Sequence, residues 1–423
     1  MTIAHREWDS PYLFFMNARP ATGHHAMDNL AIEVHAFGRQ LLVRAGPPFY
    51  TPKFLPADRR GDAQAIEEYF GERSSFKVNT VVVDGKSQCR SGRPSDKAYT
   101  SPIPERWHSS DEFDFVEGCY TLGYGDVKQG AIANGDRSVS HRRRVIFVRR
   151  DSLWIVADTM LATDHTEHEY TRVWKFPPRL VGPASGHTPV HGFSESEIIL
   201  DSNGVHTADP NGPNLWIFNA GQKPVLQRKL FGDRNPYRGW YARHLGDLTP
   251  AVDVHSTWTD AGQSTQLTLL WPRPDARPPP VIERSQAVDQ TAESPARLTL
   301  KLADGRWISI TDTGGEIRPL AAGPVHFVAE TLLAVGDKHE ARGIVIGAMQ
   351  DVARQDSSAS GSLRHDMEFT YARGRIVKKT PILPAKHFRW SDTVSGLRTV
   401  VADEGQDRCG RSLPQLPESP DVK

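Results

Sequence analysis

Short segments in which apolar and polar residues alternate recur along most of the chain. The clearest of them, 166–176, presents on one face His168, Tyr170, Arg172, Trp174 and Phe176. A period of two is typical of a β-strand, because successive side chains point to opposite sides of a sheet. Two pairs of apolar segments, 145–148 with 153–156 and 296–302 with 307–310, are separated by short polar turns and predict hairpins.

Helical signals are confined to one place. Residues 63–70 lie between a candidate N-cap, Asp62, and a candidate stop, Gly71. The β-branched segment 79–83 is instead followed by Asp84-Gly85, a pair that favours a tight turn with positive φ. We therefore expect an all-β protein, a large antiparallel β-sandwich of stacked sheets with one short helix.

The domain organisation follows from a break in this pattern. Five prolines fall between Pro272 and Pro280, and proline interrupts regular pairing. We predict a sandwich over 1–275, a linker over 276–295, a further β region over 296–400 and a disordered polar tail over 401–423. The region 296–400 is either a second domain or more of the same sandwich.

Charge and hydropathy exclude several classes of partner. The chain of 423 residues has 51 Lys and Arg against 51 Asp and Glu, so no overall field attracts nucleic acid. No apolar run is long enough to span a membrane, and we recognise no signal peptide at the N-terminus. The three cysteines, Cys89, Cys119 and Cys409, form no disulfide framework, and at most Cys89 and Cys119 could pair.

The stretch Gly23–Gly46 carries the most distinctive polar residues. His24, His25 and Asp28 precede a predicted strand, and after a break at Gly38-Arg39 a second apolar run begins. Histidine titrates near neutrality and suits general acid or base chemistry. The two histidines could equally do no more than hydrogen-bond the loop of a sandwich hairpin.

Four stretches in order resemble the C-terminal domain of the heparinase II/III-like polysaccharide lyases. They are Gly23–Gly46, Asn79–Gly85, His141–Asp158 and Arg238–Tyr241. The resemblance implies a β-sandwich that, in the family, follows an N-terminal helical toroid, with the substrate in the cleft between them. This sequence starts where the toroid would end, so we expect any toroid to be a separate chain or domain. Family members generally work outside the cytoplasm, but the localisation of this chain stays open.

The resemblance also implies the chemistry. Lyases of this type cleave uronic-acid polysaccharides by β-elimination: a base removes the C5 proton and an acid protonates the departing 4-oxygen. The uronate carboxylate needs a cationic or hydrogen-bonding partner, because the transition state is enolate-like. In the family much of this set comes from the toroid, so the partners expected here are an acidic polysaccharide and a toroid.

The resemblance assigns His24 to the histidine that the family places at the cleft, and His25 is the second catalytic candidate. The family's zinc ligands, in contrast, fall on Ala26, Arg44 and Val78. None of these residues binds zinc well, so we expect no metal and no other cofactor.

Three further residues are candidates for substrate binding. Arg143 could clamp a uronate or sulfate bidentately, although arginines at a sheet rim often only face solvent. Tyr124 lies between Gly123 and Gly125, which permits close approach of a ligand or forms a plain turn. Trp240 could stack on a sugar ring or fill a corner of the core.

Three functions remain open on this sequence. The chain could be lyase-related and act on an acidic glycan once a toroid completes its cleft. It could be a non-catalytic carbohydrate-binding or structural sandwich. It could also be a piece of a longer enzyme.

Overall fold

The computed structural model describes most of the chain. The described residues are 2–4, 10–17, 27–46, 57–59, 74–89, 105–125, 135–179, 191–202, 204–234, 236–242, 248–286, 294–351, 362–382, 388–389 and 398–399. The predicted helix 63–70 and the predicted tail 401–423 lie outside them. Within them the only helical elements are four short 3-10 turns: η2 (Ala57–Arg59), η4 (Ser75–Lys77), η5 (Arg149–Asp151) and η6 (Glu195–Glu197). None of the described helices is long and apolar enough to cross a membrane.

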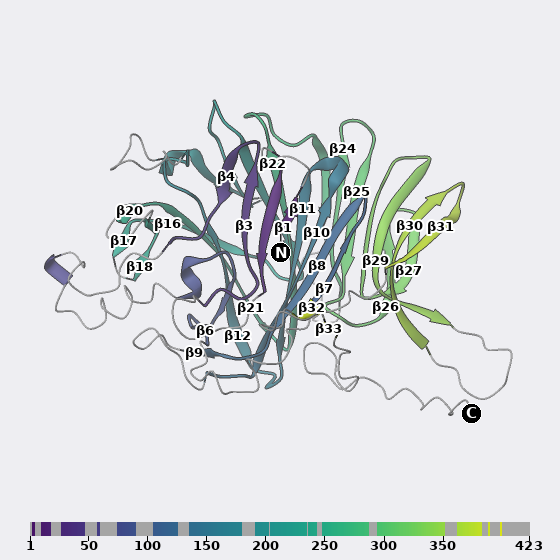
Figure 1. The fold of residues 1–423 in the computed structure, drawn as a ribbon, viewed down its shortest axis with the longest axis horizontal. Coiled ribbons are helices and arrows are strands. Elements are labelled where there is room, and N and C mark those ends of the chain that lie inside the picture. Colours follow the sequence, from purple (N-terminus) through teal and green to yellow (C-terminus); the bar gives the residue numbers. More distant parts are fainter. Residues whose placement is uncertain are drawn as a thin grey trace.

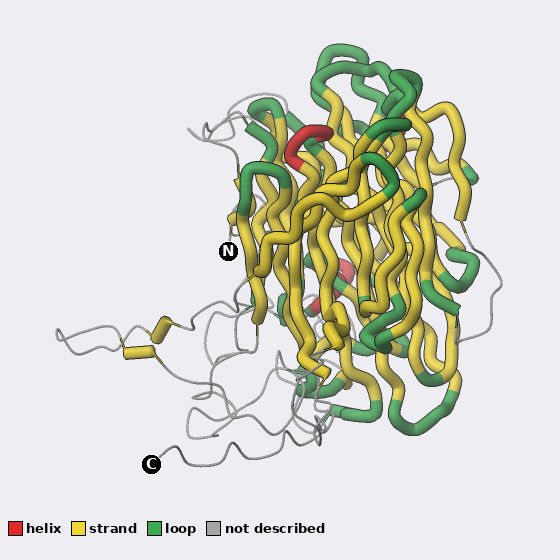
Figure 2. The backbone as a smooth tube through the Cα atoms, turned by 90° about the vertical axis from the view of Figure 1, so that its right-hand side faces the viewer, coloured by secondary structure: helices red, strands yellow, loops and turns green. Residues whose placement is uncertain are grey.

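Strands stack in three layers, seen nearly edge-on in Figure 1 and face-on in Figure 2. The first layer contains two four-stranded antiparallel sheets. One has the order β1-β2-β3-β4: β1 (Thr2–Ala4), β2 (Tyr12–Met16), β3 (Ala31–Ala36) and β4 (Arg39–Leu42). The other has the order β16-β21-β12-β5: β16 (Leu226–Phe231), β21 (Val252–Ala261), β12 (Glu167–Lys175) and β5 (Val81–Val83).

The middle layer is an eight-stranded antiparallel sheet with the order β13-β14-β15-β22-β11-β10-β8-β7. Its strands are β13 (Ile198–Asp201), β14 (Gly204–Thr207), β15 (Asn214–Gly221), β22 (Gln263–Arg273), β11 (Leu153–Ala162), β10 (Val139–Val148), β8 (Phe113–Tyr120) and β7 (Glu105–Ser109). The predicted hairpin at 145–156 forms in this sheet, and its strands β10 and β11 pair over their whole length. Ser152 closes their turn with φ 52°.

The third layer is a seven-stranded antiparallel sheet with the order β23-β24-β25-β28-β29-β30-β31. Its strands are β23 (Val281–Gln286), β24 (Ala296–Leu302), β25 (Trp307–Asp312), β28 (Thr331–Gly336), β29 (Glu340–Asp351), β30 (Ser362–Ala372) and β31 (Arg375–Ile382). The predicted linker 276–295 is therefore wrong for 281–286. Prolines precede that segment, but residues 281–286 contain none, so all of their backbone N–H groups are available for pairing with β24.

Five two-stranded ribbons complete the described strands. They are β6 (Ser87–Gln88) with β9 (Tyr124–Gly125), β17 (Asp233–Arg234) with β18 (Tyr237–Arg238), β19 (Trp240–Ala242) with β20 (Leu248–Pro250), β26 (Arg318–Ala322) with β27 (Val325–Ala329), and β32 (Phe388–Arg389) with β33 (Arg398–Thr399). The β26–β27 hairpin packs apolar side chains against the outer side of the third layer. These elements confirm the predicted all-β, stacked antiparallel sandwich.

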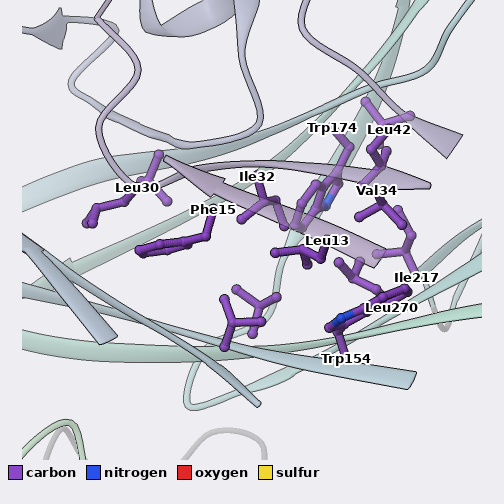
Figure 3. Close-up of a cluster of buried hydrophobic side chains, with 14 of the residues drawn as sticks. Leu13, Phe15, Leu30, Ile32, Val34, Leu42, Trp154, Trp174, Ile217 and Leu270 are labelled. Atoms are coloured by element: carbon purple, nitrogen blue, oxygen red, sulfur yellow. The ribbon is translucent and has the colours of Figure 1, made fainter. Parts of the chain in front are cut away.

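Two hydrophobic cores lie on opposite sides of the middle sheet. The first joins it to the first layer, as Leu13, Phe15, Ile32 and Trp174 approach Trp154 (Figure 3). The second joins it to the third layer and contains residues on both sides of 275, among them Ile146, Leu269 and Leu298, so the stretches 1–275 and 296–400 share a core. Alternate residues of β10 serve each core, which explains why its sequence is apolar on both faces.

Cys89 is a free, buried thiol, so it does not form the disulfide with Cys119 that the sequence allowed.

Candidate functional site: the hairpin entry

The hairpin predicted in Gly23–Gly46 forms, with Leu30, Ile32, Val34 and Ala36 directed into the first core as the alternation requires. Its open end, which we call the hairpin entry, consists of Asp28, Glu33, Arg44, Val78 and Asn79. These residues line a shallow depression together with Phe14, Met16, Ala31 and Ile32.

Asn79 fixes the geometry of the hairpin entry. Its Nδ2 donates to the carbonyl oxygens of Ile32 (2.7 Å) and Val43 (3.0 Å), and its Oδ1 accepts from the backbone N–H of Lys175 (2.7 Å). Asn79 is fully buried and so replaces the water that these backbone groups would otherwise need. One side chain thereby holds β3, the end of β4 and β12 in place around the depression.

An ion pair sets the charge of the hairpin entry. The Arg44 guanidinium donates from Nη2 to Oδ2 of Asp28. Burial raises the pKa of Glu33, while the nearby Arg44 opposes that rise and Asp28 adds to it. The depression thus holds two carboxyl groups and one partly exposed cation.

The residues at the expected zinc positions do not fit a metal ion. Arg44 is positively charged and paired with Asp28, and Val78 is an apolar side chain that is 2% exposed. Ala26 lies outside the described residues. No group of three His, Cys, Asp or Glu side chains arranged for a metal occurs in the part of the chain that the structure describes. Zinc prefers Cys, His and carboxylate ligands, and none of the three assigned residues supplies one.

Both catalytic candidates, His24 and His25, lie outside the described residues, just before the hairpin entry in sequence. Their assignment stays a prediction. The structure does describe the residues that follow them, including Asp28, which pairs with Arg44 just before β3 begins.

Arg143, predicted to bind substrate, lies in the interior. It is fully buried and makes a bidentate pair with Asp158, Nε to Oδ1 at 2.6 Å and Nη2 to Oδ2 at 3.1 Å. Its Nη1 donates to the carbonyl oxygens of Leu30 (2.6 Å) and Asn79 (2.7 Å). These bonds attach the hairpin entry to the middle sheet. They also leave no face of the Arg143 guanidinium accessible to a polysaccharide. The geometry therefore argues against the predicted substrate role of Arg143.

Comparison with known proteins agrees with this architecture. The family model described as heparinase II/III-like, C-terminal, matches residues 3–271. The chain belongs to that family. No curated protein matches the chain.

Solved structures with the same fold are lyases by title. A heparan sulfate lyase HepC mutant from Pedobacter heparinus superposes with a TM-score of 0.51 at 14% identity, over 72% of this chain and 39% of that one. A heparinase III gene product superposes with a TM-score of 0.50 at 14% identity, over 71% of this chain and 39% of that one. This heparinase II/III-like chain thus corresponds to about two fifths of the length of those relatives, and at such identity the likeness shows the fold alone.

Two other predicted substrate-binding residues of this heparinase II/III-like chain have different surroundings. Tyr124 is 2% exposed and packs edge-on against Tyr120, with ring centroids 5.5 Å apart. Burial raises its pKa far above the usual range, and the residue is too deep for direct contact with a polymer. Trp240 is half-buried, donates from Nε1 to the carbonyl oxygen of Asp233 (2.8 Å) and lies beside Tyr237. A stacking role for Trp240 stays a prediction.

The sequence reasoning did not anticipate the partners of Asp158. This buried carboxylate accepts from Arg143, from Nη1 of Arg172 (3.2 Å) and from Nε2 of His141 (2.8 Å). A signal was present, because counting outward from the turn at 149–152 pairs Arg143 with Asp158 on adjacent strands. A buried charge opposite its counter-ion favours an internal ion pair over a surface clamp.

Proposed function

We propose that this chain supplies the β-sandwich side of a polysaccharide-lyase cleft that acts on an acidic glycan. The observation that carries the proposal is the family match over residues 3–271, which includes the hairpin entry. The titles of the superposed structures, which name heparan sulfate lyase and heparinase III, support a uronic-acid-containing glycan as the substrate class.

In this proposal His24 is the catalytic residue of the chain, exchanging a proton with the substrate at the cleft, and His25 is a weaker candidate. The remaining acid–base groups and the partner of the uronate carboxylate come from a helical toroid on another chain or domain. Arg44 has a structural part: its guanidinium pairs with Asp28 at the hairpin entry, where the resemblance places a metal ion.

The test is a reconstitution. The full chain is mixed with the isolated helical toroid of a family lyase and supplied with heparan sulfate, and the ultraviolet absorbance of the unsaturated uronate product is followed. We expect the absorbance to rise only in the mixture and the rise to vanish with His24→Ala. His326→Ala, which alters an exposed histidine on β27, is the matched control. No product from any uronate polymer, with or without the toroid, would contradict the proposal.

A second candidate function is non-catalytic glycan binding. It is favoured by Arg44, which pairs with Asp28, and by Val78, because these residues occupy two of the three expected metal positions and offer no ligand. Titration calorimetry of the isolated chain against acidic glycans separates the two functions. Binding without turnover in the reconstituted mixture supports the second, and turnover lost with His24→Ala supports the first.

A further inference from the structure

A second depression lies where the three layers meet, apart from the hairpin entry. It encloses about 440 Å³ between the β13–β14 turn, the β15–β16 turn, β22 and the end of β23. Four side-chain amides line it, and we call it the amide groove after them: Asn219, Gln227, Gln266 and Gln286. An amide presents both a donor and an acceptor, so such a lining suits ligands with hydroxyl or amide groups.

Two of these amides have unused hydrogen-bonding atoms. Gln266 is fully buried, and its Nε2 donates to the carbonyl oxygen of Lys223 (3.1 Å), which fixes the orientation of the amide. Its Oε1 is buried without a hydrogen-bond partner among the described residues, and so is Nε2 of Gln227. Buried polar atoms are almost always paired in native proteins, so the groove holds one acceptor and one donor that a ligand or water would satisfy.

Both charged residues of the amide groove already have a side-chain partner. Nζ of Lys223 lies 3.5 Å from Oδ1 of Asp260, and Nδ1 of His206 lies 3.3 Å from Oδ2 of Asp201. Lys223 and Asp201 are the only charged side chains in the described lining. An anionic ligand would therefore have to compete with a carboxylate for the one ammonium group, whereas a neutral ligand would not.

The rim of the groove is apolar. Leu226, which is 74% exposed, lies there with Leu200, Pro224 and Val225. Sugars present C–H faces as well as hydroxyl groups, and the groove offers a surface for each.

From these observations we propose that the amide groove is a binding site for a neutral saccharide. It is distinct from the hairpin entry, because the two depressions share no lining residue. The proposal does not depend on lyase activity.

The test uses titration calorimetry of the full chain with three probes: an N-acetylglucosamine trimer, maltotriose and a heparan sulfate hexasaccharide. We expect at least one neutral trimer to bind, and its Kd to rise at least tenfold in Gln227→Leu and in Gln266→Met. The matched control, Gln40→Leu on β4, should keep the native Kd. Any binding of the acidic hexasaccharide should be the same in all of these proteins.

The variants are checked for native melting temperatures before titration. If Gln266→Met does not fold, Gln227→Leu on the half-exposed β16 carries the result, together with the backbone amide NMR shifts of Gly221 and Asn219 on addition of the trimer. The proposal is overturned if neither neutral trimer binds at millimolar concentration, or if the trimer binds equally to the native chain and to Gln227→Leu. Binding of the acidic probe alone, lost in the groove variants, would also overturn it.

Discussion

Arg143 and Asp158 face each other in register at the centre of the middle sheet, and both are completely buried. Burial alone would raise the pKa of Asp158, but Arg143, His141 and Arg172 together hold it far below its usual range. The same arginine supports Leu30 and Asn79 at the base of the hairpin entry. A single internal pair thus links the middle sheet to the candidate site.

Replacing the carboxylate should be costly. Asp158→Asn leaves Arg143 and Arg172 buried without a counter-charge, and breaking a buried pair in this way costs about 3–5 kcal/mol of unfolding free energy. Urea unfolding measures the loss. The control is Glu283→Gln, whose carboxylate pairs with Lys301 at an exposed position, where a change below about 1 kcal/mol is expected. Equal effects of the two substitutions would contradict the structural role of Asp158.

The free energy of unfolding should fall as the pH is lowered, already at pH values above those at which carboxyl groups titrate. Burial lowers the pKa of His35 to about 4 and that of His255 to about 3. Below about pH 6.5 these histidines bind protons in the unfolded chain but stay neutral in the folded chain. Stability is therefore lost as the pH falls, down to about pH 4 for His35 and about pH 3 for His255. Urea midpoints between pH 7.5 and 4.5 record this slope.

His35→Phe tests one contributor to that slope. His35 stacks on Tyr12 with ring centroids 4.4 Å apart, and phenylalanine keeps the stacking without a titrating group. The slope between pH 6.5 and 4 should become shallower in this variant and stay unchanged in the exposed control His326→Phe. An identical slope in all three proteins would show that His35 does not contribute.

Metal binding should require three substitutions, one at each position that the resemblance assigns to a zinc ligand. The native chain is expected to bind no zinc, even when dialysed against it, as measured by elemental analysis. Ala26→His and Val78→His with Arg44→Asp would supply ligands of the right kind and remove the cation, so the triple variant should take up one equivalent. The double variant that keeps Arg44 is the control and should bind more weakly. Stoichiometric zinc in the native chain would disprove the expectation.

Gly46 should tolerate no side chain. Its φ is +73°, and a Cβ there would lie 2.1 Å from the backbone oxygen of Ala242. Gly374 has a similar φ of +75° but open space around it, so Gly374→Ala isolates the conformational cost of about 1–2 kcal/mol. Gly46→Ala should lose clearly more than that in thermal unfolding, because the clash involves backbone. Equal losses of stability in the two variants would show that the backbone near β19 shifts to make room for the Cβ.

The fold was largely predictable because its signals are local. Alternation located β12 and both hairpins, and Asp84 and Gly85 take the positive φ values, 51° and 68°, that their turn requires. The strand at 281–286 was not predictable, since Val281–Gln286 follows a proline cluster and is defined by pairing with β24. Pairing with β24, and not the local sequence, determines that this segment is a strand.

The candidate site was predictable only in part. The family resemblance pointed to the hairpin, where Arg44 and Val78 line the same depression, and the site assignment itself stays a prediction. Whether Arg143 faces solvent or the interior depends on which layer covers β10, and no local pattern states that. The amide groove draws residues from three sheets, so no single stretch of sequence announces it.

The middle sheet has no free side. Trimming the chain at 275 to obtain a minimal fragment would uncover Ile146, Ile155 and Leu269 and leave one apolar face of the middle sheet exposed to water. Such a fragment should aggregate, so recombinant work on this protein is best done with residues 296–382 retained.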